Sequence, residues 1–134
     1  MDELFAAAKK AADSNKCCSY SRFTVGAALL TKQGKIYTGF NVENCGIQSI
    51  CAERTAFVKA LSEGEPAKIF EAIAVVGRRL EADKFARTVP CGYCRQFMSE
   101  YADSDFEIKL LDENLNEKYS YKLKDLLPEA FTDF

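Results

Sequence analysis

The chain contains no histidine, and this absence restricts the chemistry that an active site in it can use. Imidazole is the side chain whose ordinary pKa lies nearest to neutral. Without it, a general acid or base that works near neutral pH has to be a carboxylate, a thiol, a lysine or a tyrosine with a shifted pKa.

The sequence also lacks a long apolar run and an export signal. No uninterrupted apolar stretch approaches the roughly 20 residues that are needed to cross a bilayer. Residues 1–16 are charged and alanine-rich, without the apolar stretch and small-residue cleavage site of a secretory signal. These two absences predict a cytoplasmic protein with no membrane partner.

An excess of positive charge is missing as well. Lysine and arginine number 18 against 20 aspartates and glutamates, which gives a net charge of -2, and no basic run is longer than the pair Arg78-Arg79. Proteins that follow a phosphate backbone usually carry clustered positive charge. The charge balance therefore argues against a nucleic-acid partner and favours a small neutral substrate.

The sequence has enough apolar residues for one domain with a real core. Hydrophobic residues make up 48% and charged residues 28% of the 134 residues, which is ordinary for a globular protein. We find no internal repeat or linker, so we predict a single domain over residues 1–134. The six cysteines of such a chain, with no export signal, are expected to stay reduced as metal ligands or buried thiols.

The order of helical and strand-like segments predicts a three-layer α-β-α sandwich built on a five-stranded mixed sheet. Helices are expected where apolar residues recur at helical spacing or a proline opens a first turn. The expected helices cover residues 2–16, 51–64 and 91–101, with a short helical turn before Pro128. The expected strands cover residues 22–31, 36–42, 69–76, 106–111 and 119–123, and the third is apolar enough to be central in the sheet.

Two short segments combine three thiols with a carboxylate. They are Cys51-Ala52-Glu53 and, forty positions later, Pro90-Cys91-Gly92-Tyr93-Cys94. Zinc favours four tetrahedral ligands, so three thiolates would leave one position open for water, as in a catalytic site. Glu53 is then the natural proton carrier. Both segments are expected at helix starts, where partial positive charge favours thiolate, and Arg54 would offset the charge of three thiolates.

A Cys-X-X-Cys pair alone is weak evidence, because it also occurs by chance and in structural zinc sites. A closed structural site would need a fourth ligand. The remaining cysteines, Cys17, Cys18 and Cys45, show no paired spacing with the others, and we expect them to be core or partly buried thiols. A distorted arrangement that brings Cys45 to the metal stays open, since it lies only six residues before Cys51.

The two segments together, Cys51-Ala52-Glu53-Arg54 and Pro90-Cys91-Gly92-Tyr93-Cys94-Arg95-Gln96, resemble the signature of cytidine deaminases in their short, three-cysteine form. More of the chain is similar to this family. Residues 20–28 look like its first strand, residues 38–44 like its nucleoside-binding strand and residues 126–131 like its C-terminal segment. The resemblance thus covers nearly the whole domain.

This resemblance implies zinc-dependent hydrolysis of cytidine and deoxycytidine to uridine and deoxyuridine, with release of ammonia, in pyrimidine salvage. Zn2+ would be held by Cys51, Cys91 and Cys94. Glu53 would move protons from water to N3 of the base and to the leaving amine.

The resemblance also implies the substrate contacts and the assembly. The family's contacts fall on Phe23, Asn41, Glu43, Ala52 and Phe131. Asn41 and Glu43 match a ribose-binding pair, and the Ala52 amide would orient the pyrimidine edge together with Glu53. Phe23 and Phe131 match aromatics at the base, the latter from a neighbouring subunit of a homotetramer with shared sites. By residue type alone, the two phenylalanines would be core residues, and Asn41 and Glu43 would share a solvated strand face.

One segment departs from the family's pattern. From Glu43 to Cys51 the chain advances eight positions where the family usually advances nine, and Gly46-Ile47-Gln48 stands where a tyrosine is expected. That tyrosine normally helps to build a neighbour's site. The departure affects the contacts to the 5'-hydroxyl, the subunit interface and the strict preference for cytidine and deoxycytidine.

Other functions stay open on these grounds. The altered loop admits a deaminase of another aminopyrimidine nucleoside, such as a blasticidin S-type antibiotic. A non-catalytic binding domain with a structural zinc is a hypothesis of a different functional class, and it predicts that Glu53→Gln would have no effect. A polynucleotide editor finds no support in the charge pattern.

Overall fold

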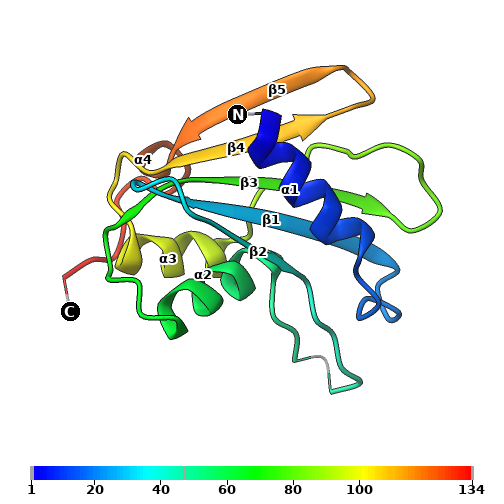
Figure 1. The fold of residues 1–134 in the computed structure, drawn as a ribbon, viewed down its shortest axis with the longest axis horizontal. Coiled ribbons are helices and arrows are strands. Elements are labelled where there is room, and N and C mark those ends of the chain that lie inside the picture. Colours follow the sequence, from blue (N-terminus) through cyan, green and yellow to red (C-terminus); the bar gives the residue numbers. More distant parts are fainter. Residues whose placement is uncertain (1, 47, 134) are drawn as a thin grey trace.

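The structure, a computed structural model, describes residues 2–46 and 48–133 as helices packed on both sides of one sheet (Figure 1). In chain order the elements are α1 (Asp2–Asp13), β1 (Phe23–Thr31), β2 (Ile36–Phe40), α2 (Ala52–Ser62), β3 (Phe70–Arg79), α3 (Gly92–Tyr101), β4 (Glu107–Asp112), β5 (Glu117–Lys122) and α4 (Leu123–Leu126).

The sheet has the strand order β2-β1-β3-β4-β5. The pair β3 and β4 is parallel and the other neighbours are antiparallel, so the sheet is mixed. The apolar strand β3 is central, as its sequence predicted, and most of its side chains are buried. With α1 on one face and α2 and α3 on the other (Figure 1), the predicted three-layer sandwich is confirmed.

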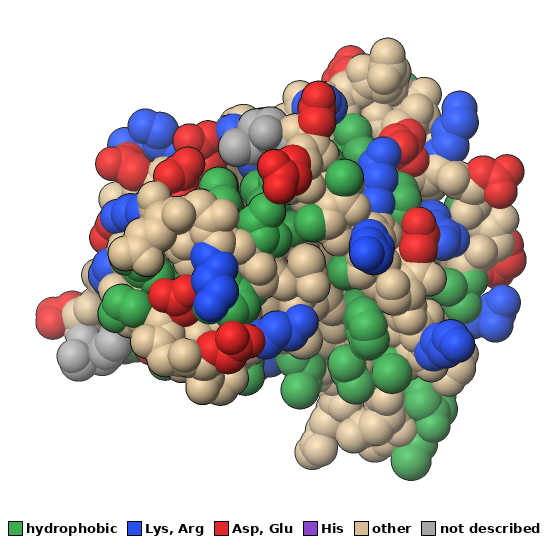
Figure 2. All heavy atoms as spheres, in the orientation of Figure 1, with side chains coloured by type: hydrophobic (Ala, Val, Ile, Leu, Met, Phe, Trp, Pro, Cys, Tyr) green, Lys and Arg blue, Asp and Glu red, His purple; other side chains and the backbone are tan. Residues whose placement is uncertain are grey.

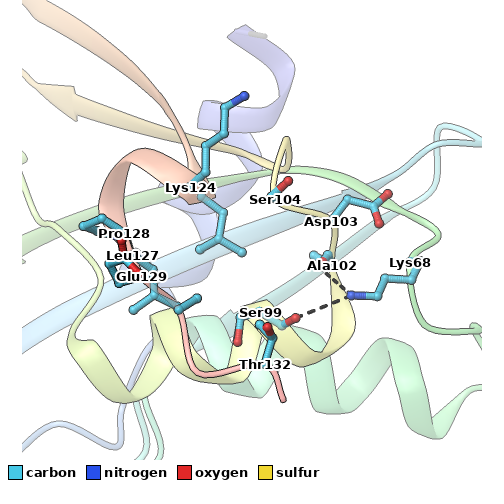
Figure 3. Close-up of a pocket in the computed structure, with 12 residues that line it drawn as sticks. Lys68, Ser99, Ala102, Asp103, Ser104, Lys124, Leu127, Pro128, Glu129 and Thr132 are labelled. Atoms are coloured by element: carbon cyan, nitrogen blue, oxygen red, sulfur yellow. Dashed lines mark hydrogen bonds between the residues drawn. The ribbon is translucent and has the colours of Figure 1, made fainter.

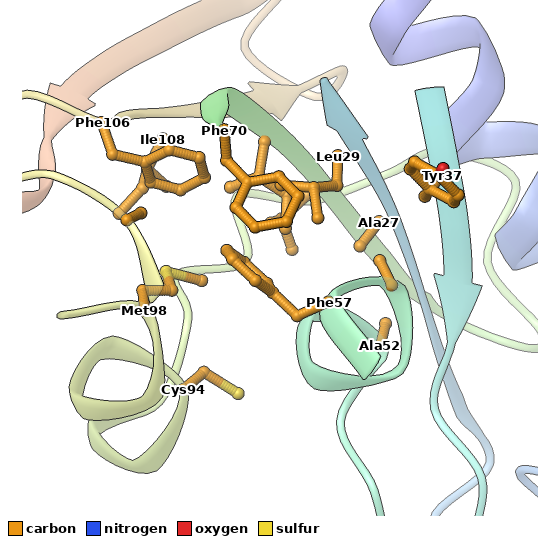
Figure 4. Close-up of a cluster of buried hydrophobic side chains, with 14 of the residues drawn as sticks. Ala27, Leu29, Tyr37, Ala52, Phe57, Phe70, Cys94, Met98, Phe106 and Ile108 are labelled. Atoms are coloured by element: carbon orange, nitrogen blue, oxygen red, sulfur yellow. The ribbon is translucent and has the colours of Figure 1, made fainter. Parts of the chain in front are cut away.

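Each face of the sheet has its own core. Beneath α1, the buried residues of the helix are those that its apolar spacing predicted: Leu4, Phe5, Ala8 and Ala12. On the opposite face, Phe57 of α2 meets Phe70 edge-on with 5.0 Å between ring centroids, and Met98 and Cys94 of α3 complete the cluster (Figure 4). The core of the second face therefore reaches directly to one of the predicted metal ligands.

Two glycines let the helices approach the sheet closely. A Cβ on Gly26 of β1 would lie 2.0 Å from the carbonyl oxygen of Ala8 in α1. A Cβ on Gly39 of β2 would lie 2.7 Å from the carbonyl oxygen of Ala52 and from the amide nitrogen of Ala56, both in α2. Neither position has room for a side chain, so Gly39 helps to fix where α2 begins.

Some elements differ in extent from the prediction: α2 ends at Ser62 rather than residue 64, and β3 continues to Arg79 rather than ending at residue 76. Helix α1 and strand β2 also end early, and asparagine side chains give the reason for these two. Helix α1 ends at Asp13 rather than near residue 16, and the Asn15 Oδ1 accepts a hydrogen bond of 2.7 Å from the Cys17 amide, which turns the chain. Strand β2 ends at Phe40 rather than near Val42. There, the Val25 amide donates to the Asn41 side chain at 2.9 Å in place of a further ladder bond.

The surface seen in Figure 2 mixes lysine and arginine with aspartate and glutamate side chains, while hydrophobic side chains gather toward the loop that follows β2. Val42 and Ile50, at the two ends of that loop, are 37% and 48% exposed. Over residues 2–46 and 48–133, we find no helix that combines the length and the apolar character of a membrane span.

Candidate metal centre and active site

The three cysteines of the two motifs meet at one point of the structure. Their sulfur atoms all lie within 4.8 Å of one another, with 3.9 Å between Cys51 Sγ and Cys91 Sγ and 3.7 Å between Cys91 Sγ and Cys94 Sγ. All three are free thiols. Ligands held tetrahedrally at a Zn–S distance of about 2.3 Å are themselves about 3.8 Å apart. The observed separations thus fit zinc.

The starts of α2 and α3 place these sulfurs. Cys51 is the N-cap residue of α2, Cys91 is the N-cap residue of α3, and Cys94 lies in the first turn of α3. The partial positive charge of a helix start favours an anion, so both helices stabilise thiolate at this point. Cys94 is buried while Cys91 is exposed, which leaves the cluster anchored in the core and open toward solvent on one side.

Even without a cation, the thiols of the cluster differ in how readily they ionise. A hydrogen bond from Cys94 and the neighbouring Arg54 guanidinium lower the pKa of the Cys51 thiol to about 5. The same interaction with Cys51, together with burial, raises the pKa of Cys94. Cys51 is therefore the more acidic thiol of the pair, and a bound divalent cation would favour ionisation of the other thiols as well.

Arg54 lies directly against this cluster. Its Nη2 atom is 3.4 Å from Cys51 Sγ, and its guanidinium carbon is 4.0 Å from the centroid of the Tyr93 ring. The sequence suggested that Arg54 offsets thiolate charge, and its position supports that interpretation. Tyr93, which belongs to the second motif, had no role assigned from the sequence.

Glu53 is the buried carboxylate of the site, with only 4% of its surface exposed. Burial, with a smaller contribution from the Cys51 charge, raises its pKa from 4.5 to about 7. A group with this pKa can both accept and release a proton near neutral pH. The absence of histidine is thus compensated by a carboxylate that the fold has shifted into the same range.

Asn41 and Glu43 lie together just beyond the end of β2. The Asn41 Nδ2 donates to the Phe23 carbonyl at 2.9 Å and faces Glu43 Oε2 at 3.5 Å. Although partial burial opposes it, hydrogen bonds from Ser21 and Tyr20 lower the pKa of Glu43, so this carboxylate is an acceptor. An amide donor beside a carboxylate acceptor suits a hydroxyl, which can accept from one and donate to the other.

Asn15 was missed by the sequence analysis, although it holds Asn41 in place. It is 9% exposed, and its Nδ2 donates to the Asn41 side-chain oxygen at 2.7 Å and to the Asn41 carbonyl at 3.0 Å. Because the Asn41 oxygen accepts from Asn15 and from the Val25 amide, the amide nitrogen has to face Glu43. No local pattern reveals this pairing, since the two asparagines are 26 residues apart.

The remaining predicted substrate residues occupy different parts of the domain. Ala52 is fully buried at the first position of α2, next to Cys51. Phe23 is partly buried at the first position of β1. Phe131 is 65% exposed in the C-terminal segment, where its carbonyl accepts a hydrogen bond from the side chain of Gln96. Within this subunit, Phe131 is therefore not a core residue.

The other cysteines differ from the expectation in part. Cys18 is buried, as predicted, but Cys17 and Cys45 are exposed. Both are exposed and lie in loops, one after α1 and one after β2. Among the described residues, the metal-ligating cluster consists of Cys51, Cys91 and Cys94, so Cys45 is not part of it. The altered loop at 46–48 is described only at its ends, because Ile47 lies outside the described residues.

A cavity of about 400 Å³ lies elsewhere, between the C-terminal end of α3, α4 and the chain end (Figure 3). The Lys68 ammonium at its edge donates to the carbonyl oxygen of Ala102 at 2.9 Å. This lysine thus caps α3, whose opposite end carries the cysteines. The cavity is therefore separate from the chemistry of the metal cluster.

Comparison with known proteins agrees with this geometry. Residues 1–109 match the family described as the cytidine and deoxycytidylate deaminase zinc-binding region. A probable cytidine deaminase of Dictyostelium discoideum is 47% identical over 116 residues, which are 86% of this chain and 73% of that protein. The cytidine deaminase of Sporosarcina psychrophila is 41% identical over 135 residues, which are 98% of this chain and 91% of that protein.

A solved structure is similar over almost the same extent. The crystal structure of cytidine deaminase from Burkholderia pseudomallei superposes with a TM-score of 0.85 at 42% sequence identity, covering 97% of this chain and 98% of that one. The fold, the cysteine cluster and the sequence similarity all indicate the same zinc-binding family.

Proposed function

The chain belongs to the cytidine and deoxycytidylate deaminase family, and from this membership we propose that it hydrolyses cytidine and deoxycytidine to uridine and deoxyuridine. The reaction consumes one water and releases ammonia. The observation that carries the proposal is the buried Glu53, with a pKa raised to about 7 by burial, two residues after a cysteine of the metal cluster.

We propose that Cys51, Cys91 and Cys94 hold zinc and that Glu53 carries the protons. When bound, zinc supplies the Lewis acidity that makes water a nucleophile near neutral pH. Glu53 accepts a proton from the attacking water and gives it to N3 of the base. It then moves the second proton of that water to the amine, which leaves as ammonia while C4 keeps the oxygen.

The proposed substrate contacts rest on the family membership and on the hydrogen-bonding groups that these residues offer. Asn41 and Glu43 together offer the donor and the acceptor that a sugar hydroxyl requires. Ala52 lies at the start of α2, between Cys51 and Glu53 in the sequence, where its backbone can orient the pyrimidine edge. Phe23 contacts the base, and the exposed Phe131 does so in the site of a neighbouring subunit.

We also propose that the protein assembles as a homotetramer and acts in pyrimidine salvage in the cytoplasm. The shared sites of such an assembly would bury exposed apolar residues, among them Val58 and Phe131, which are 51% and 65% exposed in one subunit. A reducing compartment is supported by the free thiols of the cluster, because thiol ligands have to stay reduced to bind a metal.

The test follows the loss of ultraviolet absorbance when purified protein is mixed with cytidine, with and without prior treatment with a chelator. We expect rapid conversion to uridine that the chelator abolishes and added zinc restores. Deoxycytidine and blasticidin S are assayed side by side. A flat trace with cytidine from zinc-loaded protein, together with turnover of blasticidin S, would contradict the proposal and favour the antibiotic as substrate.

A further inference from the structure

We propose that Tyr93 is a positioning residue of the metal centre: its ring holds the Arg54 guanidinium against the Cys51 sulfur. Tyr93 is 67% exposed, so the core does not require it. It stands between Cys91 and Cys94 in the first turn of α3, whereas Arg54 belongs to α2. The contact therefore joins the two helices whose starts carry the ligands.

The geometry shows what holds the Arg54 side chain. Its Nη2 reaches Cys51 Sγ at 3.4 Å, and its guanidinium carbon lies 4.0 Å from the Tyr93 ring centroid. The Nε atom is buried and has no hydrogen-bond partner among the residues that the structure describes. The Nη2 edge of the guanidinium thus faces the Cys51 sulfur, while the Tyr93 ring contacts the face of the guanidinium. This ring contact helps to hold a group whose Nε makes no hydrogen bond to the described residues.

The position of the Arg54 guanidinium matters because the metal-bound cluster would carry negative charge. Three thiolates around a divalent cation leave one excess negative charge, and a fixed guanidinium beside Cys51 stabilises it. A free arginine side chain samples many rotamers, and ordering it costs conformational entropy. An aromatic ring that stacks on the guanidinium reduces the number of these rotamers and adds a cation–π attraction. Tyr93 therefore acts on the metal only through Arg54.

The experiment measures the rate at which zinc passes from the folded holoprotein to an excess of a chelating dye, at one pH. Tyr93→Ala should release zinc about two- to fivefold faster, which corresponds to a cation–π contact at an exposed site. Tyr93→Phe keeps the ring and should release zinc at the wild-type rate. Leu115→Ala removes another large exposed side chain, 64% exposed in the turn between β4 and β5, and serves as the matched control.

A second set of variants, made in an Arg54→Met protein, distinguishes the positioning of Arg54 by Tyr93 from a contact of Tyr93 between subunits. In an Arg54→Met protein, Tyr93→Ala should cause no additional acceleration, because the residue through which the ring acts is gone. The inference is overturned if Tyr93→Ala leaves zinc release unchanged, if Tyr93→Phe accelerates it equally, or if the acceleration persists in the Arg54→Met background. Zinc release is independent of the substrate, so these results do not depend on whether cytidine is deaminated.

Discussion

On each face of the sheet, a helix packs closely against a glycine of a strand, but the two contacts have different consequences. On one face, α1 rests on Gly26 and buries apolar side chains: Leu4, Phe5, Ala8 and Ala12. On the other, α2 rests on Gly39 and follows Cys51 of the cysteine cluster, and its first residues are Ala52 and the buried Glu53. The difference teaches that close packing stabilises the fold on both faces, but only on the second face does it set the position of reactive groups.

The largest effect is expected from Glu53→Gln on the second face. The substitution removes the proton carrier and keeps its size, so turnover should fall by ~10²–10⁴-fold while zinc content and fold are retained. Deamination of cytidine and zinc per chain are the measurements. Glu3→Gln, on the exposed side of α1, is the control and should leave turnover unchanged. Substantial turnover by Glu53→Gln would contradict the role of Glu53 as the proton carrier.

The comparison between the faces is tested most directly by its two glycines. Gly26→Ala and Gly39→Ala each force a helix away from the sheet, and each should lower the free energy of unfolding by ~3 kcal/mol. Only Gly39→Ala should also weaken zinc binding, because it displaces the start of α2 and with it Cys51.

Urea unfolding and zinc release from the folded variants measure these two effects separately. Equal loss of zinc in both variants would mean that the position of the metal site depends on overall stability and not on the local contact at Gly39.

A smaller effect concerns the pH dependence of stability. Burial raises the Glu53 pKa from 4.5 to about 7. The stabilising contribution of the protonated acid is therefore complete below 4.5 and is lost as the pH rises through about 7. In zinc-free protein, Glu53→Gln should thus gain ~2 kcal/mol in unfolding free energy over wild type between pH 5 and pH 8. Glu3→Gln should gain nothing, and an equal gain there would contradict this explanation.

The smallest effect is expected from Asn15→Ala, which loosens the segment around Asn41 without touching the cysteines. The loss of its hydrogen bonds should lower the free energy of unfolding by ~1 to 2 kcal/mol. Zinc release should not change, whereas the KM for cytidine should rise because the Asn41 amide is no longer fixed. Gln33→Ala in the exposed β1–β2 turn is the control, and a kcat defect with unchanged KM would count against this role for Asn15.

Much of the fold was predictable, because the patterns that define it are local. The spacing of Leu4, Phe5, Ala8 and Ala12 predicted the buried side of α1, and the apolar run in β3 predicted its central place. The ends of α1 and β2 were predicted too far along the chain. Asn15 and Asn41 determine those ends through hydrogen bonds to Cys17 and Val25, and sequence periodicity does not report such bonds.

The sequence by itself determined the metal chemistry. Cysteines three positions apart share one helical turn. A chain without histidine has to use a carboxylate or another group with a shifted pKa as its acid or base. Glu53 is only two positions after Cys51, so both lie at the same helix start. These are consequences of residue type and short spacing, which no later packing alters.

Only the tertiary structure decided the rest. It brings Cys51 and Cys91, forty residues apart, to 3.9 Å, and it exposes Cys17 and Cys45 instead of burying them. It also buries Glu53, and the loss of water around this carboxylate is what raises its pKa. Distances across the sheet and desolvation depend on how the whole chain packs, and for that reason they cannot be read from any one segment.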